Sequence, residues 1–597
     1  MMYMRTIKLR EGVLHFPVKP GINKRHTLQI WAGGVMLREF LLAITDQEEF
    51  EYFFLDLREF VGRDVTLILP GPAAAPDRTS APDRTSAPDR TSAPETAGLC
   101  ADVLDRVIDG GDCEPGSPLY PDLYREALRP QFHFSSRRGW LNDPNGLVSI
   151  NGEHHMYYQH NPLGTPHGSA NICWGHAVSA ADGQWDFIRW KEHSDAILPW
   201  RRDWLVASGS AVADAENAAG YGENAIIAAF TALGSDNLKG GVFPSGGQFL
   251  AASTDGGESF YLFSSQAAVP TKNGYGWRDP RLFRYGDHYV MAVYETFEGV
   301  NCVSFYVSKD FHNWRWASRN MNLYECPDIF PLALESGETK WALFGADGMV
   351  RIGDFDGYGF IESGVSHPLD YGDSTYAGQT WNNHPEGKRI HISWIRGMGS
   401  LKGEVLGYEG MPFSQCMSLA CELSLKKEGS GTPSEGWAPA AGRASVEGRT
   451  AAAGRASAAG WRVLRNPVKG AASLRMGESE NSETAVDGEW EIPVAPRNEY
   501  CLRAADITSS SLIINAGRHI IRFVPQDRTL YFENGHSCLL DTAELDLRVF
   551  VDTTTMELFF ADGIAATYAM HPRDMRLALQ GKCALRCERW GLASIWE

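Results

Sequence analysis

The sequence predicts an all-β protein, and two observations support this fold class. Short segments that alternate apolar and polar residues follow one another along most of the 597 residues, and Gly, Asn and Asp stand between them as in hairpin turns. Helical periodicity is almost missing from the same regions. We therefore expect a five-bladed β-propeller as the main domain, a C-terminal β-sandwich after it and a small N-terminal β-domain before it.

Residues 1–70 are predicted to form the small N-terminal domain, which we expect to be sandwich-like. The segment LQIWAGGVMLREF carries Gly33 and Gly34 where a hairpin would turn, and FEYFFLDLREF and DVTLILP follow as further strands. The hexapeptide APDRTS then occurs three times, with a degenerate fourth copy. Because such a composition cannot form a core, we predict that residues 71–124 are a linker.

Residues 125–410 are predicted to be the propeller. Strand-like segments such as GLVSINGEHHMYYQH and DPRLFRYGDHYVMAVYE are closely spaced there, and the region is long enough for about five four-stranded blades. Residues 411–597 alternate strongly and are predicted to form the C-terminal sandwich. A low-complexity stretch at 426–460, in which AAGRAS occurs twice, is interpreted as an insertion in a surface loop of that sandwich.

The composition narrows the possible functions. With a formal net charge of −19, the chain lacks the basic footprint of a nucleic-acid-binding protein and is not expected to dock on an anionic membrane. A neutral substrate is therefore the expected partner. The composition leaves the oligomeric state open. The first residues contain no apolar region of a signal peptide, so we expect a cytoplasmic protein. Eleven scattered cysteines without a CxxC pair indicate reduced thiols, and we predict neither a bound metal nor a cofactor.

Three acidic residues stand in unusual contexts within the predicted propeller: Asp143 in WLNDPNG, Asp279 in WRDP and Glu325 in YECPD. A proline directly after Asp143 and after Asp279 favours extended backbone at the acid, which lets a side chain at a strand end point along the propeller axis. Retaining glycosidases need two carboxyl groups about 5–5.5 Å apart, one as nucleophile and one as general acid/base. Taken alone, each context is also compatible with an ordinary turn.

The region from Arg129, RPQFHFSSRRGWLNDPNGLVSINGEHHMYYQHNP followed by WGHAVS, strongly resembles glycoside hydrolase family 32, which contains invertases, levanases and exo-inulinases. LRVFVDTTTMELFFADG, much later in the chain, resembles the accessory β-sandwich of that family. The N-terminal domain is only weakly similar to a domain that precedes the propeller in some bacterial members. Further family motifs follow in the family's order: SGSAV at 208–212, STDGG at 253–257, RDPRLF at 278–283, ECPDIF at 325–330 and DYG…YAGQT between 370 and 380.

The resemblance implies a retaining β-fructosidase that acts on a fructose-containing oligo- or polysaccharide. Asp143 matches the nucleophile that forms a fructosyl-enzyme intermediate, and Glu325 matches the general acid/base. Asp279 matches the acid that stabilises the transition state. Five further residues match positions that line or adjoin the fructose pocket: Asn142, Gln159, Trp174, Ser208 and Arg278.

The chain departs from the family pattern in four motifs, none of which includes the three acids. Because two aromatic walls of the sugar pocket are lost or supplied elsewhere, the identity of the β-fructoside stays open. The departures are Ser169-Ala170-Asn171 in place of WGN, Ala207-Ser208-Gly209-Ser210 in place of FSGS, Ser374 in place of the acid of YGxDFYA, and Ala420-Cys421-Glu422-Leu423 in place of PREL.

The histidines at 154, 155, 160, 167 and 176 are clustered in the sequence. Strand alternation is expected to send them to different faces of a sheet. We therefore expect structural or sugar-contact roles for them rather than a metal site.

Three alternative functions remain beside hydrolysis with retention. A fructosyltransferase would use the same covalent intermediate and pass fructose to another sugar. An inverting propeller glycosidase, such as an arabinan-active enzyme, would hold its carboxyl groups about 6.5–9.5 Å apart to admit a water molecule. A non-catalytic carbohydrate-binding relative would be expected to lack Asp143 or Glu325, and both are present.

Overall fold

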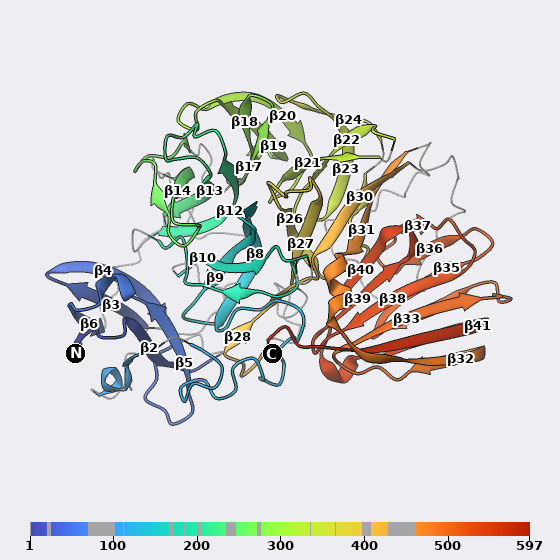
Figure 1. Cartoon of the computed structure of the whole chain (residues 1–597), viewed down its shortest axis with the longest axis horizontal. Helices are drawn as coiled ribbons and strands as arrows, with labels where there is room; N and C mark the ends of the chain where they lie inside the picture. Colours follow the sequence, from blue (N-terminus) through green and yellow to red (C-terminus); the bar gives the residue numbers. More distant parts are fainter. Residues whose placement is uncertain are drawn as a thin grey trace.

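The computed structural model describes residues 2–20, 26–69, 102–111, 113–165, 171–183, 186–199, 204–234, 246–270, 276–334, 336–364, 366–396, 408–427 and 460–596. Regular structure within them is almost entirely β-strand, as the sequence predicts. Figure 1 shows a small N-terminal part in blue, a central part and a C-terminal part in red. No helix of the described ranges is long and apolar enough to cross a membrane. The APDRTS repeats, His167 and nearly all of the predicted insertion lie outside these ranges.

Short 3-10 helices connect some of the strands. They are η1 (Arg58–Phe60), η2 (Val103–Arg106), η5 (Lys469–Leu474), η6 (Ala561–Gly563) and η7 (Pro572–Asp574).

Two small sheets pack on a common core in the N-terminal part. The first has the strand order β1-β6-β3-β4 and the second β5-β2-β7. Alternate residues point into the core, for example Leu28 and Ile30 on β3 and Val65 and Leu67 on β6. The strands are β1 (Tyr3–Lys8), β2 (Val13–Val18), β3 (His26–Ala32), β4 (Val35–Leu42), β5 (Glu51–Asp56), β6 (Asp64–Leu69) and β7 (Ile108–Gly110).

The structure differs from the predicted linker at 71–124 in its later part. β7 pairs with β2, and Val103 and Leu104 are buried in the N-terminal core. The composition that indicates a linker belongs to the repeats, whereas the apolar residues after them complete the N-terminal core. The boundary of this domain therefore includes residues well beyond 70.

The central part consists of five sheets that follow one another along the chain, with β8, β12, β17, β21 and β26 as their first strands. All pairs but one are antiparallel. The strands are β8 (Gly139–Ile150), β9 (Glu153–Asn161), β10 (Cys173–Ala180) and β11 (Lys191–Glu192); β12 (Trp204–Asp214), β13 (Ala225–Gly234), β14 (Gly247–Ser253), β15 (Tyr261–Leu262) and β16 (Val269–Pro270); β17 (Trp277–Tyr285), β18 (His288–Phe297), β19 (Val300–Ser308) and β20 (Arg315–Met321); β21 (Asp328–Ala333), β22 (Thr339–Phe344), β23 (Met349–Phe355), β24 (Phe360–Glu362) and β25 (His367–Pro368); β26 (Thr375–Thr380), β27 (Arg389–Ile395), β28 (Phe413–Ser414), β29 (Cys416–Met417), β30 (Cys421–Lys427) and β31 (Trp461–Pro467).

The five first strands lie around a common centre (Figure 1). β8 contacts β12 and β26, β12 contacts β17, and β21 contacts β26. Arg281 on β17 reaches Asp328 on β21, with 2.7 Å between Nε and Oδ1. β28 pairs in parallel with Gly139 and Trp140 of β8, so a segment from residue 413 onward closes the ring against the first sheet.

The fifth sheet extends beyond the predicted boundary at residue 410, which is therefore wrong. β30 pairs with β27, and β31 pairs with β30 as far as Lys427 and Trp461. The insertion predicted at 426–460 consequently interrupts a hairpin of the central part and not a loop of the C-terminal sandwich. Alternation identifies a segment as a strand but does not tell which sheet the strand joins, and this is the reason for the error.

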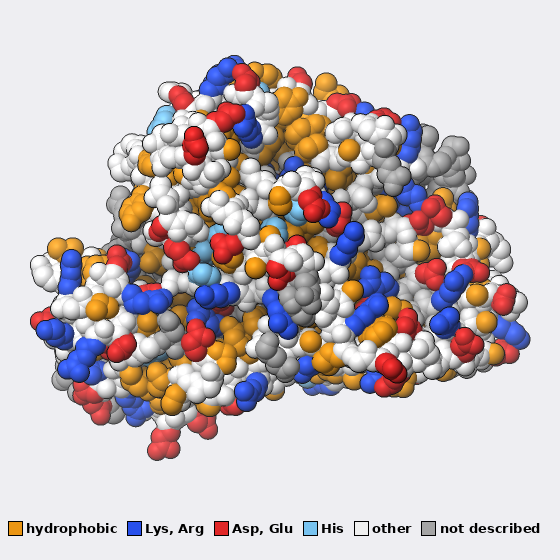
Figure 2. Space-filling model, in the orientation of Figure 1, with side chains coloured by type: hydrophobic (Ala, Val, Ile, Leu, Met, Phe, Trp, Pro, Cys, Tyr) orange, Lys and Arg blue, Asp and Glu red, His pale blue; other side chains and the backbone are white. Residues whose placement is uncertain are grey.

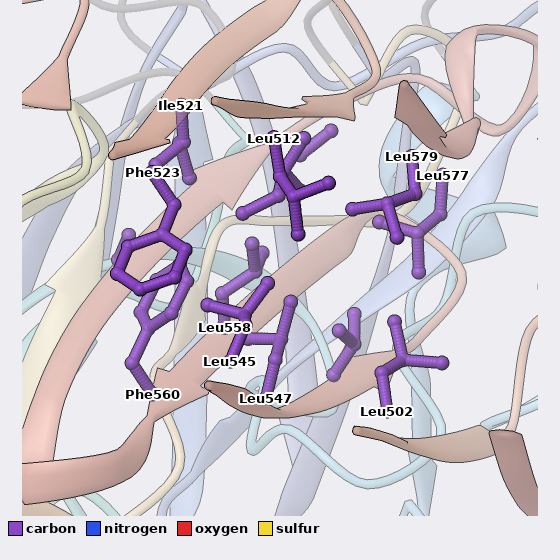
Figure 3. Packing of buried hydrophobic residues seen from close by; sticks show 14 of the residues in the cluster. Leu502, Leu512, Ile521, Phe523, Leu545, Leu547, Leu558, Phe560, Leu577 and Leu579 are labelled. Carbon is purple, nitrogen blue, oxygen red and sulfur yellow. The ribbon is translucent and has the colours of Figure 1, made fainter. Parts of the chain in front are cut away.

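The C-terminal part forms two layers of strands around one core. β41 pairs with β32 along nearly its whole length, with β34 through its first residues and with β33 through its last. The strands are β32 (Arg475–Ile492), β33 (Asn498–Ala505), β34 (Leu512–Ala516), β35 (His519–Val524), β36 (Thr529–Phe532), β37 (Ser537–Leu539), β38 (Leu545–Val551), β39 (Thr555–Phe560), β40 (Ile564–Ala569) and β41 (Leu577–Leu592). Figure 3 shows the core between them, to which Leu502, Leu512, Ile521, Phe523, Leu545, Leu547, Leu558, Phe560, Leu577 and Leu579 contribute.

A buried charged network joins the central part to the C-terminal part. His133, shortly before β8, lies between two carboxylates: its Nδ1 is 2.8 Å from Asp552 Oδ2, and its Nε2 is 2.8 Å from Glu557 Oε1. Burial opposes protonation, but the two carboxylates outweigh burial and raise the pKa of His133 to about 9. A protonated imidazole between two carboxylates thus fixes the position of β8 against the C-terminal part.

Candidate active site

The first strands of the five sheets are the inner strands of the ring. The structure brings the three predicted acids together at one end of these inner strands. Asp143 is on β8, Asp279 is on β17, and Glu325 is in the turn before β21. Cys326 lies among them, because its Sγ is 3.7 Å from Asp143 Oδ2 and 3.5 Å from Asp279 Oδ2. Glu325 joins the group through Arg278, which forms ion pairs with both Glu325 and Asp279.

Register shifts in four of the inner strands fall on site residues. A β-bulge bends a strand and changes the direction of the side chains at the irregularity. Pro144 and Pro280 contribute to two of these shifts, since a proline has no N–H to donate to the ladder. The shifts lie between Leu141 and Pro144 on β8, Val206 and Gly209 on β12, Arg278 and Arg281 on β17, and Tyr376 and Gln379 on β26.

The backbone at two of the acids has left-handed geometry. The φ angles are 60° at Asp279, 46° at Glu325 and 39° at Cys326. Such angles cost about 1–3 kcal/mol each for a non-glycine residue and are typical of functional sites. Neighbouring groups hold this backbone: Thr231 Oγ1 accepts from Asp279 N at 2.8 Å, and Cys326 N donates to Asp279 Oδ2 at 3.2 Å.

Glu325 has one partner on each carboxylate oxygen. Arg278 donates to Oε1, and the hydroxyl of Tyr376 donates to Oε2. The guanidinium of Arg278 also lies over the ring of Tyr294, 4.5 Å from its centre. These contacts hold the carboxyl group of Glu325 in one orientation, toward the ends of β8 and β17 that carry the other two acids.

Asp143 is held by hydrogen bonds that favour its ionised form. Ser208 Oγ donates to Asp143 Oδ2 at 2.7 Å, from the bulge of β12. Burial raises the pKa of Asp143, the hydrogen bonds from Ser208 and Asn142 lower it, and the charge of Glu325 raises it again, with a net rise. The carboxylate therefore combines low solvation with a fixed direction.

Asp279 has a strongly raised pKa. Burial raises its pKa to about 7, Arg278 opposes the rise, and the charges of Glu325 and Asp143 add to it. Arg278 pairs with Asp279 and Glu325 but not with Asp143, so the group of three acids has an excess of carboxyl groups over guanidinium groups. The outer surface differs, because positive and negative side chains are mixed over the visible face of the molecule (Figure 2).

Two of the predicted pocket residues are buried behind the site. Trp174 has no exposed surface and donates from Nε1 to the carbonyl oxygen of Ala207 at 3.0 Å. Gln159 is also buried and donates to the carbonyl oxygen of Val206 at 3.2 Å. Both support the bulge that carries Ser208. Trp174 therefore offers no ring face to a sugar, because alternation on β10 turns it into the core between the first two sheets.

Aromatic surface is present at the site although the sequence motifs suggest its loss. Trp140 and Trp394 meet edge to face with ring centres 6.0 Å apart, and Trp394 meets Tyr376 in the same way at 6.1 Å. All three are partly exposed. Trp140 Nε1 donates to Asn142 Oδ1 at 2.9 Å, which also fixes the amide of Asn142 beside Asp143. A row of rings of this kind suits stacking against a sugar.

One residue in each of two departing motifs makes a contact between domains. Asn171 bonds both backbone groups of Leu41 on β4, donating to its oxygen at 2.7 Å and accepting from its nitrogen at 3.0 Å. Ser374 is buried and accepts from Ala569 N, on β40, at 2.9 Å. Ser169 and Ala170 lie outside the described residues. Asn171 and Ser374 thus connect the central part to its two neighbours.

Sequence reasoning gave no role to three residues that contact the acids. Cys326 and Tyr376 stand inside quoted motifs, so a signal for them was present. Thr231 lies on β13, in a segment of ordinary strand composition, and nothing in the sequence distinguishes it. Its role depends on the packing of β17 against β12 and β13, which only the fold provides.

The histidines form contacts that the alternation argument describes only in part. His154 and His155 do point to opposite faces, since His154 meets Ser149 whereas His155 meets His176. His155 and His176, however, lie together, and their ring nitrogens are 3.0 Å apart. Neighbouring strands place them on the same face, so the expectation of separate faces was wrong for this pair. Two groups of described residues could hold a metal ion: His160, Cys173 and Asp195, and His176, His193 and Glu258.

Comparison with known proteins gives a consistent set of matches. The glycosyl hydrolases family 32 N-terminal domain matches residues 133–432, which is half of the chain. The levanase of Bacillus subtilis (strain 168) is 30% identical over 301 residues, covering 46% of this chain and 42% of that protein. The extracellular exo-inulinase of Aspergillus awamori is 28% identical over 373 residues, covering 53% of this chain and 67% of that protein.

Solved structures match over a larger share of the chain. The crystal structure of exo-inulinase from Aspergillus awamori has a TM-score of 0.63 at 20% identity and covers 79% of this chain and 100% of that one. A fructofuranosidase from Schwanniomyces occidentalis, in complex with fructosylnystose, has a TM-score of 0.58 at 20% identity. The chain spans less than half of the length of the Bacillus levanases that it matches, at 42% and 49%.

Proposed function

Because the chain belongs to glycosyl hydrolase family 32, we propose that it is a β-fructosidase, which releases fructose from fructans such as levan or inulin, from sucrose, or from both. The observation that supports this most directly is the meeting of Asp143, Asp279 and Glu325 beside Arg278. Sugar hydrolysis needs paired carboxyl groups in a partly dry cleft, and no other group of acids in the described residues has this arrangement on the inner strands.

In this proposal, the five sheets are the blades of a five-bladed β-propeller that forms the catalytic domain. It extends from about residue 125 to β31, with the C-terminal β-sandwich behind it and the N-terminal β-domain beside it. The similarity to the exo-inulinase structure, with a TM-score of 0.63 over 79% of the chain, supports this architecture. Inner strands of a propeller end at its axis, which is where a substrate can reach several blades at once.

The chemistry proceeds in two displacements. Asp143 attacks the anomeric carbon of fructose while Glu325 donates its proton to the departing glycosidic oxygen. The result is a fructosyl ester on Asp143 and a free leaving group. Glu325, now ionised, removes a proton from water, which attacks the same carbon and releases Asp143 as a carboxylate. Two inversions give overall retention.

Neighbouring side chains fit the two roles. Ser208 and Asn142 donate to Asp143 and keep it ionised against the effect of burial. Arg278 and Tyr376 orient Glu325 toward the leaving oxygen. Asp279 faces the carbon that develops positive charge and lowers the energy of the oxocarbenium-like transition state in its ionised form. Its pKa of about 7 places that ionisation in the neutral range.

The substrate class follows from the relatives and from the charge of the site. The relatives are named levanase and exo-inulinase, and one neighbouring structure holds fructosylnystose. A neutral saccharide suits a site with excess negative charge better than a phosphorylated one does. Trp140, Trp394 and Tyr376 provide rings for a sugar beyond the acids.

The stereochemistry of the first product tests the mechanism. Purified protein is mixed with sucrose, inulin or levan, and NMR records the anomer of fructose before mutarotation. We expect β-fructofuranose first, with Asp143→Asn as the inactive control. Initial release of the α anomer would instead indicate an inverting enzyme.

The product profile tests the alternative of fructosyl transfer, since water and a second sugar compete for the same ester on Asp143. We expect free fructose to dominate at low and at high sucrose concentration. Oligosaccharides longer than the substrate as the main product would assign the chain to the fructosyltransferases. No reaction with any of the three substrates would overturn the proposal.

A further inference from the structure

We propose that His176, His193 and Glu258 bind a divalent transition-metal ion, with Zn²⁺ as the best fit, and that this ion links the first two sheets of the central part. One potential ligand atom from each of the three residues lies within 4.8 Å of the others. In a tetrahedral zinc site with bonds of about 2.0–2.2 Å, ligand atoms are about 3.3–3.6 Å apart. His193 and Glu258, at the exposed end of the group, are the ligands that would have to adjust to reach that spacing.

The three ligands come from separate elements that meet at the surface. His176 is on β10 and completely buried, whereas His193 directly follows β11 and is partly exposed. Glu258 is exposed, in the turn after β14 of the second sheet. His193 Nδ1 and Glu258 Oε1 are already 2.7 Å apart. The group therefore runs from the core to the solvent, which leaves a path by which an ion and a water ligand can enter.

His176 supplies an independent reason to expect a ligand. Its Nδ1 is buried and has no hydrogen-bond partner among the described residues. Buried polar nitrogens are normally satisfied, so such an atom calls for an explanation. Its Nε2 lies 3.0 Å from His155 Nδ1. A metal on Nδ1 would leave Nε2–H to donate to His155, the supporting bond that metal-binding histidines usually make.

The surroundings hold these groups in place before any ion binds. The ring of Tyr157 stacks on His176 with centres 4.4 Å apart, and its hydroxyl donates to the oxygen of Gly257 at 3.0 Å. Gly257 has φ +91°, and a Cβ there would lie 2.4 Å from the Tyr157 hydroxyl. Only glycine fits so close an approach, and it fixes the position of Glu258 next to it.

In the second group of possible ligands, the histidine has no ring nitrogen without a partner. In the group of His160, Cys173 and Asp195, the His160 Nδ1 lies 2.7 Å from Asp195 Oδ1, and its Nε2 lies 3.0 Å from the oxygen of Arg138. Both ring nitrogens are thus engaged within the protein. His160 is a satisfied structural histidine, and only the site at His176 calls for an ion.

Metal binding to the full chain tests the proposal. Protein stripped with EDTA is dialysed against Zn²⁺ and its metal content is measured, and Co²⁺ is added separately as a spectroscopic probe of tetrahedral coordination. We expect one Zn²⁺ per chain, a tetrahedral Co²⁺ spectrum, and a melting temperature that rises with Zn²⁺ concentration. Hydrolysis of sucrose should change little, because the site does not contact the three acids.

Two ligand variants and one control decide the location. His193→Ala and Glu258→Gln should each weaken Zn²⁺ binding by at least about 100-fold. They should also abolish the rise in melting temperature. His312→Ala, at an exposed histidine in the turn between β19 and β20, should bind as the wild type does. Absence of a stoichiometric ion in the wild type, or an ion that persists in the His193→Ala/Glu258→Gln double variant, would overturn the proposal.

Discussion

The segment Arg278-Asp279-Pro280-Arg281 supplies one arginine to each of two charged layers, and the layers differ in their balance of charge. Arg278 pairs with Asp279 and Glu325, and Asp143 lies beside them across Cys326, so the layer holds three carboxyl groups and one guanidinium. Arg281, three residues further along β17, forms an ion pair with one carboxylate of the described residues, Asp328, with 2.7 Å between Nε and Oδ1. The first layer is open to solvent at Glu325, whereas the second is fully buried.

Hydrogen bonds to neighbouring residues surround the ion pair of the second layer. Arg281 donates to the carbonyl oxygen of Thr380 at 3.0 Å and to Asn382 Oδ1 at 3.1 Å. Thr380 N donates to Asp328 Oδ2 at 2.6 Å. Asn382 also donates to Ala211 on β12 at 2.7 Å. This layer joins inner strands of several sheets beneath the acids.

The comparison separates what makes a layer reactive from what makes it stable. Burial, with the charges of neighbouring carboxyl groups added to it, raises the pKa of Asp143 and of Asp279, and the left-handed backbone adds strain at the same place. Matched charges, with hydrogen bonds to Thr380 and Asn382, give a layer that binds the sheets together. Four predictions test this division, from the largest expected effect to the smallest.

Asp143→Asn should remove the nucleophile and lower kcat by about 10⁴-fold or more, equivalent to about 5.5 kcal/mol. The folded structure should persist, because the neutral amide relieves repulsion in the first layer. Steady-state hydrolysis of sucrose or fructan measures the first effect, and thermal melting with circular dichroism measures the second. Turnover within tenfold of the wild type would contradict the role of Asp143.

Arg281→Met should destabilise the protein by about 3–5 kcal/mol, since it leaves Asp328 as an unpaired buried charge. The double variant Arg281→Met/Asp328→Leu removes both charges and should recover most of that loss. Denaturant unfolding of the two variants beside the wild type makes the comparison. A double variant no more stable than the single one would show that the hydrogen bonds of Arg281, rather than the ion pair, determine the stability of this layer.

Asp279→Asn should stabilise the protein in a manner that depends on pH. The pKa of Asp279 is raised to about 7 in the folded state, above its ordinary value, so the folded state retains a proton that unfolding releases. Stability of the wild type therefore falls as pH rises from about 4 to 7, and the amide avoids this loss. We expect no gain near pH 4 and a gain of about 2 kcal/mol above pH 7, because the neighbouring acids share the shift.

The measurement for Asp279→Asn is the free energy of unfolding at several pH values, in the absence of substrate. Asp354→Asn, at an exposed carboxylate on β23, is the control and should show no such trend. A gain that is equal at all pH values, or largest at pH 4, would mean that burial does not hold the proton on Asp279.

Tyr376→Phe should have the smallest effect of the four, about tenfold in kcat or about 1.4 kcal/mol. The variant removes the hydroxyl that donates to Glu325 Oε2 and keeps the ring that packs on Trp394. Arg278 still orients the other oxygen, so KM should change little. Tyr285→Phe, whose hydroxyl bonds Phe355 away from the site, is the matched control. An unchanged kcat would show that Arg278 alone orients Glu325.

The sequence carried enough information to predict which acids meet. Asp143, Asp279 and Glu325 stand in motifs, and the prolines after two of them account for bulges that the fold then shows at these positions. The fold class was also readable, since alternation and turn residues are local signals. Which strand pairs with which is not local, so the assignment of β30 and β31 to the fifth sheet was missed.

The direction of individual side chains was the second feature that could not be predicted from the sequence. Trp174 stands in a family motif, yet its ring is buried between two sheets and contacts the backbone of Ala207. Trp394, which does face the site, carries no motif that marks it. Alternation tells that neighbours on a strand point to opposite faces but not which face is the cleft. The balance of charge around Arg278 and Arg281 likewise requires the positions of all four acids in space.

The pairing of β41 sets an order of events during synthesis. Its partners β32, β33 and β34 precede it by roughly 60 to 85 residues, which a ribosome adds in about 3–17 s at about 5–20 residues per second. Among the described strands, β32 pairs with β41 alone, so its long edge has no partner during that interval. All described strands of the central ring have been made once β31 is complete, whereas the C-terminal core still waits for β41. The nascent chain is therefore most exposed to edge-to-edge aggregation after synthesis of the central ring, and chaperones would act in that interval.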